Sequence, residues 1–358
     1  MTLEEVIQGI VPADQEAMGR AKARWDSIAK PLGSLGALED AVIRIAGMSG
    51  SPDVDISKRA VVVMCADNGV VDEGVSQTGR EVTAAVTRNF TVGNASVCIM
   101  ARRAGAEVVP VDIGVADSLE GCGRVYPLQS CKIMAGTRNF AREEAMTEAE
   151  ARAAVAVGIG QVKRLKERGC RIIATGEMGI GNTTTSSALV SVLLGKEVRA
   201  VTGRGAGLSD ESLERKVQVI EKAIALHRPN WQDPMDVLKK LGGLDIAGLA
   251  GVFLGGAMYG IPVVVDGFIS AAAALTAERM CPGCADYMLA SHVSAEPAGA
   301  MVLTALGLKP VIQAGMCLGE GTGAVAALPL FQMAADVYSQ MSTFQENSIQ
   351  EYQEFSHA

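Results

Sequence analysis

Residues 171–187 read RIIATGEMGIGNTTTSS, and this stretch decides the fold. An apolar, strand-like run, 171–175, stops at Gly176. Glu177 follows, then two alternating glycines, and then a hydroxyl-rich segment that leads into a helical pattern from Ala188. Glycines let backbone N–H groups point toward one spot, and a helix N-terminus adds unpaired N–H groups and the positive end of its dipole. The stretch therefore predicts a phosphate site with a carboxylate beside it.

Short apolar runs recur along the chain on both sides of this stretch, and each ends in small or polar residues. They are 60–66, 107–113, 171–175, 198–201, 261–265 and 310–314. Stretches with helical periodicity lie between them, such as 147–168 and 210–226. Strands that are apolar throughout and separated by helices favour a parallel sheet covered on both faces. We therefore predict an α/β fold with a mostly parallel, Rossmann-like sheet flanked by helices.

Both ends of the chain have helical patterns. Residues 2–48 are helical with a break at 30–36, and residues 330–357 are helical again and become polar. We predict that residues 1–50 and 331–358 form a small helical domain beside a large α/β substrate-binding and catalytic domain, 51–330.

The net charge, the cysteine content and the first residues of the chain indicate which partners and which compartment to expect. The net charge of −8 gives a nucleic-acid partner no electrostatic support. The eight cysteines are interpreted as buried free thiols of a reducing compartment, because a chain of 358 residues does not need a disulfide scaffold. The first nine residues contain two Glu and no basic cluster, so we predict a cytoplasmic protein.

Residues 246–265 carry no charge and resemble a membrane span in this respect alone. Five glycines and Pro262 interrupt the segment, and Asp245 and Asp266 bound it. A buried helix followed by a buried strand explains it better, and we expect no membrane association.

The Gly179-x-Gly181 turn is neither a Walker A loop nor a dinucleotide fingerprint, because the lysine of the first and the third glycine of the second are missing. By itself it is consistent with a tight strand-to-helix connection. The five hydroxyls of 183–187 are unfavourable inside a helix but suited to capping and to phosphate oxygens. They favour phosphate or nucleotide binding.

Two charged residues elsewhere are candidates. Glu320 stands between two glycines in apolar surroundings, which raise a carboxyl pKa and suit a general base; the alternative is an exposed loop acid. Lys216 follows the glycine-rich loop 203–207 and is placed to neutralise a phosphate, although the sequence alone favours a solvated helix-face lysine.

Two further motifs are interpreted as structural. Cys281 and Cys284 form one CxxC, and the three histidines show no ligand spacing to it, so we predict no metal site. His292 is interpreted as a hydrogen-bonded core histidine in preference to an acid–base group.

Taken together, these segments resemble one family, the nicotinate-nucleotide–dimethylbenzimidazole phosphoribosyltransferases of cobalamin synthesis. The matching pieces occur in family order over nearly the whole chain: KPLGSLG at 30–36 with LE at 38–39, ADNGV at 66–70, EGVS at 73–76, GTRNF at 136–140, GEMGIGNTT at 176–184, GRG at 203–205, VDGF at 265–268, SH at 291–292, SAEP at 294–297 and LGEGTG at 318–323.

The resemblance implies that nicotinate mononucleotide exchanges its nicotinate for 5,6-dimethylbenzimidazole, giving α-ribazole 5′-phosphate with C1′ inverted. It implies no cofactor and no metal, a homodimer, and small-molecule substrates only. The residue roles that it implies are Glu320 as general base, Glu177 as second acid near the ribose, a 5′-phosphate and nucleotide site of Gly179, Ile180, Gly181, Asn182, Thr183, Lys216 and Ser294, and a base pocket with Ser76, Met178 and Leu318.

Two alternatives stay open. One is the same reaction type with another acceptor base, such as adenine or a phenol, because acceptor choice depends on pocket shape. The other is a non-catalytic nucleotide-binding or regulatory protein, which has no need for a carboxylate in an apolar glycine turn.

Overall fold

The computed structural model describes residues 2–352, and its centre is a six-stranded sheet in which all paired strands are parallel. The strand order is β3-β2-β1-β4-β5-β6. Their bounds are Arg59–Ala66 (β1), Ala106–Gly114 (β2), Gln129–Ser130 (β3), Ile172–Met178 (β4), Val263–Val265 (β5) and Met288–Ala290 (β6). This is the order of the doubly wound Rossmann fold, and its direction reverses between β1 and β4, where such sheets bind ligands. The predicted fold class is confirmed.

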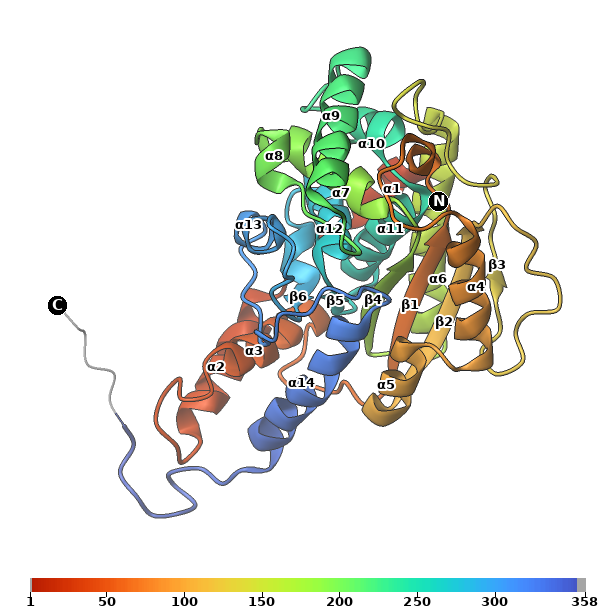
Figure 1. The fold of residues 1–358 in the computed structure, drawn as a ribbon. Helices are drawn as coiled ribbons and strands as arrows, with labels where there is room; N and C mark the ends of the chain where they lie inside the picture. The colour runs from red at the N-terminus through yellow and green to blue at the C-terminus, as the bar shows by residue number, and fades with distance from the viewer. Residues whose placement is uncertain (1, 353–358) are drawn as a thin grey trace.

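Helices cover both faces of the sheet (Figure 1). α4 (Glu81–Val92), α5 (Ser96–Ala104) and α14 (Thr322–Gln340) pack on one face, and α6 (Glu148–Glu167), α11 (Leu244–Tyr259) and α12 (Phe268–Met280) on the other. α6 and α11 approach closely because both present glycines: a Cβ atom on Gly158 or Gly251 would overlap the backbone of the opposite helix. With few aromatic residues, close helix contact supplies much of the packing.

The remaining helices surround this core. They are α1 (Leu3–Gly9), α2 (Gln15–Ser27), α3 (Ala37–Ser49), α7 (Asn182–Leu194), α8 (Val198–Val201), α9 (Asp210–His227), α10 (Pro234–Leu241), α13 (Gly299–Ala305) and the 3₁₀ turns η1 (Gly69–Glu73) and η2 (Cys284–Tyr287).

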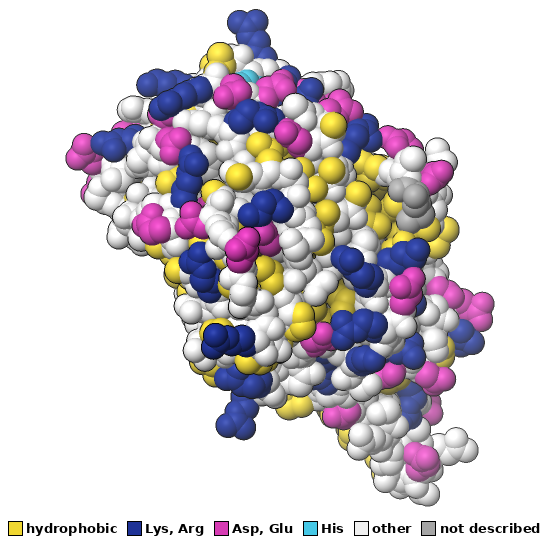
Figure 2. Space-filling view, turned by 90° about the vertical axis from the view of Figure 1, so that its right-hand side faces the viewer, with side chains coloured by type: hydrophobic (Ala, Val, Ile, Leu, Met, Phe, Trp, Pro, Cys, Tyr) yellow, Lys and Arg dark blue, Asp and Glu magenta, His cyan; other side chains and the backbone are white. Residues whose placement is uncertain are grey.

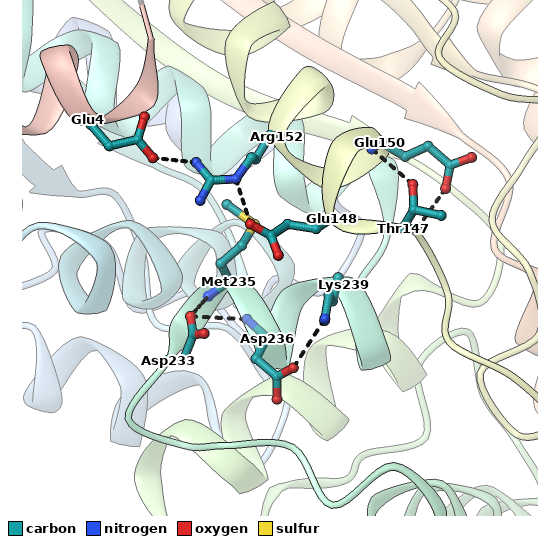
Figure 3. Close-up of polar contacts among 9 residues, drawn as sticks. All are labelled: Glu4, Thr147, Glu148, Glu150, Arg152, Asp233, Met235, Asp236 and Lys239. Atoms are coloured by element: carbon teal, nitrogen blue, oxygen red, sulfur yellow. Dashed lines mark hydrogen bonds and ion pairs between the residues drawn. The ribbon is translucent and has the colours of Figure 1, made fainter.

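Figure 3 shows polar side chains that cap the N-termini of α6 and α10 and that connect α1 to α6. Thr147 caps α6 in a capping box with Glu150, and Asp233 caps α10 by accepting from two backbone N–H groups. Arg152 of α6 bonds Glu4 of α1 at 2.6 Å and Glu148 at 2.9 Å. Caps of this kind satisfy helix N–H groups that have no partner inside the helix.

Helices from the two ends of the chain meet. Trp25 of α2, Ala46 of α3 and Tyr338 of α14 belong to one small apolar cluster, in which the rings of Trp25 and Tyr338 lie 5.2 Å apart between centroids. α3 and α14 also contact the large core, so the division into a small helical and a large α/β domain stays a prediction.

The sequence-based strand assignment differs from the structure in four places. Residues 198–201 form the helical turn α8, because Val198 and Val201 are both buried at helical spacing. Residues 310–314 form no strand; only Ile312 makes a single parallel bridge to His292. The short strands β3 and β6 were not predicted, because two or three residues carry too little periodicity to be recognised.

The C-terminal helix also differs from the expectation. α14 begins at Thr322 and ends at Gln340, with Pro329 inside it, so the later part of the predicted 330–357 helix is not helical as far as residue 352. Residues 353–357 of that prediction lie outside the described residues.

The uncharged segment 246–265 is a buried helix, α11, followed by the buried strand β5, as predicted. Among residues 2–352, no helix is long and apolar enough to cross a membrane. All eight cysteines are free thiols, and five of them are buried. On the face that Figure 2 shows, acidic and basic side chains are mixed over the surface, without a continuous basic stripe.

Candidate active site

A cavity of about 560 Å³ opens at the carboxyl ends of the central strands. Its wall comes from the end of β4 and the β4–α7 turn, from Asp266 after β5, from the loop 204–208 and from residues 317–320 before α14. Ligands of doubly wound sheets bind in this position, at the point where the strand order reverses. The cavity is therefore the candidate active site.

The structure brings the predicted site residues together. All of them except Lys216 line this cavity: Glu320, Glu177, Gly179, Ile180, Gly181, Asn182, Thr183, Ser294, Ser76, Met178 and Leu318. Lys216 lies directly behind the wall, where it bonds Thr183. Their assigned roles stay predictions, but their common location agrees with a single site.

The β4–α7 turn differs from the sequence prediction at both ends. β4 continues through Gly176 and ends at Met178, and α7 already begins at Asn182, with Gly181 as its N-cap at φ 93°. The hydroxyls of 183–187 therefore lie inside the helix; Ser187, for example, donates to the carbonyl of Thr183 at 2.9 Å. This bond to the preceding turn satisfies the buried Ser187 hydroxyl, whereas the buried hydroxyls of Thr184 and Ser186 have no partner among residues 2–352. Only Thr183 of this group faces the cavity.

The backbone N–H groups of the turn are partly used within the protein. Ile180 donates to Thr83 Oγ1 at 3.1 Å, and Asn182 donates to the carbonyl of Gly179 at 3.0 Å. The N–H groups of Gly181 and Thr183 have no acceptor among residues 2–352. These two groups are available to an anion at the start of α7.

Lys216 is fully buried, which contradicts the interpretation as a solvated helix-face lysine. α9 packs its inner face on α7, and Nζ donates to Thr183 Oγ1 at 2.9 Å and to the Gly203 carbonyl at 3.1 Å. Burial lowers the pKa of Lys216 to about 8, and the carboxylate of Glu296 opposes this decrease. Lys216 thus joins the phosphate-binding candidates of α7 to the glycine loop.

Glu177 lies at the end of β4 with 6% of its surface exposed. The pKa of Glu177 is raised to about 8, mainly by burial and also by the nearby carboxylates of Asp245, Asp266 and Glu320, while a hydrogen bond from Asn182 opposes the rise. At neutral pH the free site therefore holds a proton on Glu177.

Glu320 has an unusual backbone conformation, with φ 61° between Gly319 at 85° and Gly321 at 93°. Three successive residues in the left-handed region turn the chain sharply and place the side chain against α5, where Oε2 accepts a hydrogen bond from the Val97 N–H at 3.2 Å. Burial raises the pKa of Glu320, and the Val97 N–H opposes that rise.

Two glycines make room for the two glutamates. A Cβ atom on Gly319 would lie 2.5 Å from Glu177 Oε1, and one on Gly176 would collide with the carbonyl of Glu320. The β4 end and the 319–321 turn are therefore in direct contact.

Sequence reasoning missed several cavity residues. Asp266 is buried after β5, and its Oδ1 accepts from the Ala324 N–H at 2.8 Å. His292 is hydrogen-bonded to Ser291 Oγ at 3.0 Å, as a core histidine would be, yet it lines the cavity. Glu296 accepts from the Gly205 N–H at 3.0 Å. The available signals were the position of Asp266 at a strand end and the family-matching pieces VDGF, SH and SAEP, which contain these three residues.

The residues that the resemblance assigns to the base pocket differ in exposure. Met178 is buried in the cavity floor, whereas the side chain of Leu318 is 60% exposed at its rim. Among residues 2–352, no group of three or more His, Cys, Asp or Glu side chains is arranged to hold a metal ion.

Comparisons with known proteins agree with this geometry. A phosphoribosyltransferase family model matches residues 10–349. The nicotinate-nucleotide–dimethylbenzimidazole phosphoribosyltransferases of Acetivibrio thermocellus and Clostridium acetobutylicum are 47% and 46% identical, and each alignment covers 98% of this chain and 99% of the relative. The crystal structure of CobT from Thermus thermophilus has a TM-score of 0.89 and 40% identity, over 94% of this chain and all of that one.

Proposed function

Because the chain belongs to the nicotinate-nucleotide–dimethylbenzimidazole phosphoribosyltransferase family, we propose that it converts nicotinate mononucleotide and 5,6-dimethylbenzimidazole to α-ribazole 5′-phosphate and nicotinate in cobalamin nucleotide-loop assembly. In this reaction C1′ inverts and Glu320 is the general base. The observation that carries the proposal is that one cavity is lined both by carboxyl groups, Glu177 and Glu320 among them, and by the donors at the start of α7.

The 5′-phosphate binds at the start of α7. The free N–H groups of Gly181 and Thr183, the Thr183 hydroxyl and Ser294 surround it, and Lys216 supplies positive charge from behind Thr183. Asn182 contributes little here, because its backbone N–H and its side-chain amide both have acceptors within the protein.

The ribose lies toward Glu177. As nicotinate leaves, its nitrogen loses positive charge while C1′ gains oxocarbenium character. Glu177 is protonated in the free site at neutral pH, and the positive pyridinium ring of the bound nucleotide lowers its pKa and so favours its ionisation. The resulting carboxylate stabilises the developing cation at C1′ more than it stabilises the ground state.

The acceptor base lies toward Ser76, Met178 and Leu318. Its neutral nitrogen attacks C1′ from the face opposite to the leaving nicotinate, which inverts the configuration. The second ring nitrogen becomes acidic as the new bond forms, and Glu320 takes its proton. The raised pKa of Glu320 supports this role, because a base works best with a pKa near the working pH.

A homodimer is part of the proposal, because the resemblance implies it. The exposed Leu318 at the cavity rim is consistent with cover from a second subunit. Light scattering of the purified protein tests this independently of activity.

The decisive experiment is incubation with nicotinate mononucleotide and a panel of acceptors that contains 5,6-dimethylbenzimidazole, benzimidazole, adenine and phenol. Chromatography follows nicotinate release, and NMR gives the configuration at C1′. We expect release with 5,6-dimethylbenzimidazole and an α-anomeric product. A β-anomeric product would show that C1′ is not inverted. A preference for adenine or phenol would show that the acceptor is not 5,6-dimethylbenzimidazole. If no acceptor causes nicotinate release, the proposed activity is wrong.

A further inference from the structure

We propose that Asp245 is a positioning residue for this reaction: through the side-chain amide of Asn182 it holds the carboxyl group of Glu177 at the cavity and maintains a second negative charge beside it. Sequence analysis assigned no role to Asp245. The inference rests on the proposed function and adds a residue that does not line the cavity.

Hydrogen bonds link the three side chains. Asp245 is in the first turn of α11 and is fully buried. Its Oδ2 accepts from Asn182 Nδ2 at 2.9 Å, and the same nitrogen donates to Glu177 Oε2. An amide nitrogen has two protons, and both are used here. Asn182 therefore joins the carboxylate of α11 to the carboxyl group at the end of β4.

The backbone around this link is shaped for Asp245. A Cβ atom on Gly179 would lie 2.6 Å from Asp245 Oδ2, and one on Gly243 would lie 2.5 Å from Asp245 Oδ1. Gly179 belongs to the glycine turn that sequence analysis assigned to phosphate binding. A glycine at position 179 is therefore needed to make room for the Asp245 carboxylate, in addition to any role in phosphate binding.

Stability alone does not account for an acid at this position. Asp245 Oδ1 makes no hydrogen bond of good geometry among residues 2–352. Burial raises the pKa of Asp245 to about 6, although Asn182, Asn68 and the backbone N–H groups of Asp245 and Ile246 oppose this rise. A buried and incompletely bonded carboxylate is unfavourable for folding. Buried polar groups that lack a full set of hydrogen bonds tend to occur where function requires them.

The charges around Glu177 come from several elements. Asp245 of α11, Asp266 after β5 and Glu320 before α14 are acidic. The basic residues at the site are Arg204 and His292, which line the same cavity, and Lys216, which lies behind Thr183. Asp245 thus opposes ionisation of Glu177, whereas the Asn182 hydrogen bond favours it.

These opposite effects give a test that needs no activity. Glutamate labelled with ¹³C at Cδ is titrated by NMR in the substrate-free protein, and the Glu177 signal is identified by its loss in Glu177→Gln. In Asp245→Asn the pKa of Glu177 should fall by about one unit or more, because a like charge is removed. In Asn182→Ala it should rise, because a donor to the carboxylate is lost.

Activity gives the second readout. In Asp245→Asn the acidic limb of the kcat/KM profile should move to lower pH, and kcat should fall at least ~10-fold while KM for nicotinate mononucleotide changes little, because misplacement of a reacting group lowers kcat. Asp112→Asn is the matched control. Like Asp245, Asp112 is buried and does not line the cavity, but it lies near the end of β2 and pairs with Lys132. It should leave the Glu177 pKa and the profile unchanged.

Shifts of opposite sign in the two variants support the proposal. An unmoved Glu177 pKa in either variant, or shifts of the same sign, overturns it. If Asp245→Asn does not fold, Asp245→Ser takes its place, because it removes the same negative charge: a lowered Glu177 pKa supports the role of Asp245, and an unchanged one overturns it. The NMR result is obtained even if the protein releases no nicotinate, so failure of the proposed function is recognised separately.

Discussion

The carboxyl group of Glu320 lies at the N-terminus of α5, where Oε2 accepts a hydrogen bond from the Val97 N–H at 3.2 Å. The helix dipole and this N–H favour the ionised carboxylate, whereas burial favours the protonated form. The two influences together produce a carboxyl group that is oriented by the backbone and still basic enough to accept a proton.

We expect Glu320→Gln to bind nicotinate mononucleotide normally and to lose at least ~10²-fold in kcat, because the amide cannot accept the proton of the attacking base. The amide oxygen can still accept from Val97, so the turn keeps its structure. Steady-state kinetics and calorimetric titration measure the two quantities. Near-normal turnover would show that another group is the base.

Gly176→Ala should reduce kcat/KM at least ~10-fold, because its Cβ atom would collide with the carbonyl of Glu320, and that residue already has a left-handed backbone conformation. Gly160→Ala in α6 is the control, since no atom lies within 4 Å of its Cβ position. It should keep full activity and gain about 0.5–1 kcal/mol in stability. Full activity of Gly176→Ala would show that catalysis does not depend on the close approach of β4 to the 319–321 turn.

Lys216→Met should raise the Kd for nicotinate mononucleotide at least ~10-fold, because a charged donor behind Thr183 is lost. The pKa of Lys216 and that of Glu177 are both about 8, so the test is made in a Glu177→Gln background, where only Lys216 titrates in this range. There the affinity should fall as the pH rises through about 8, and addition of Lys216→Met should abolish this fall. Lys222→Met on the exposed side of the same helix is the control and should change neither quantity. If the pH dependence is the same with and without Lys216→Met, Lys216 does not interact with the 5′-phosphate.

Glu177→Gln should be inactive but increasingly more stable than wild type as the pH rises. The pKa of Glu177 is about 8 in the folded protein and about 4.5 in the unfolded chain, so from pH 4.5 to 8 only the unfolded chain ionises. Wild-type stability therefore falls over this range, by up to about 1.4 kcal/mol per pH unit from this group. Urea unfolding at pH 5 and pH 7.5 measures the difference.

Glu150→Gln is the matched control for that comparison. The hydrogen bond from Arg138 lowers the pKa of Glu150 to about 2, so both its folded and its unfolded values lie below pH 5. Its stability difference from wild type should be the same at pH 5 and pH 7.5. A Glu177→Gln difference that is equally constant would show that Glu177 is already ionised in the folded site.

Local sequence information predicted the elements that position the site. The apolar runs that became β1, β2, β4 and β5 are long enough to show that both their faces are buried. Polar residues and glycines at their carboxyl ends identified Glu177 and the turn after it. Short elements such as β6, and the start of α7 inside a hydroxyl run, were missed because long-range packing decides them.

The sequence by itself determined the fold class and identified Glu177 and Glu320 as site residues, because apolar periodicity and glycine placement are local properties. Only the tertiary structure decided that Lys216 is buried and that Asp245 reaches Glu177 through Asn182. Burial and hydrogen bonding between distant segments determine the pKa of each group, and they arise when α9, α11 and β4 pack against one another or against α7. No pattern along the chain records which of these contacts will form.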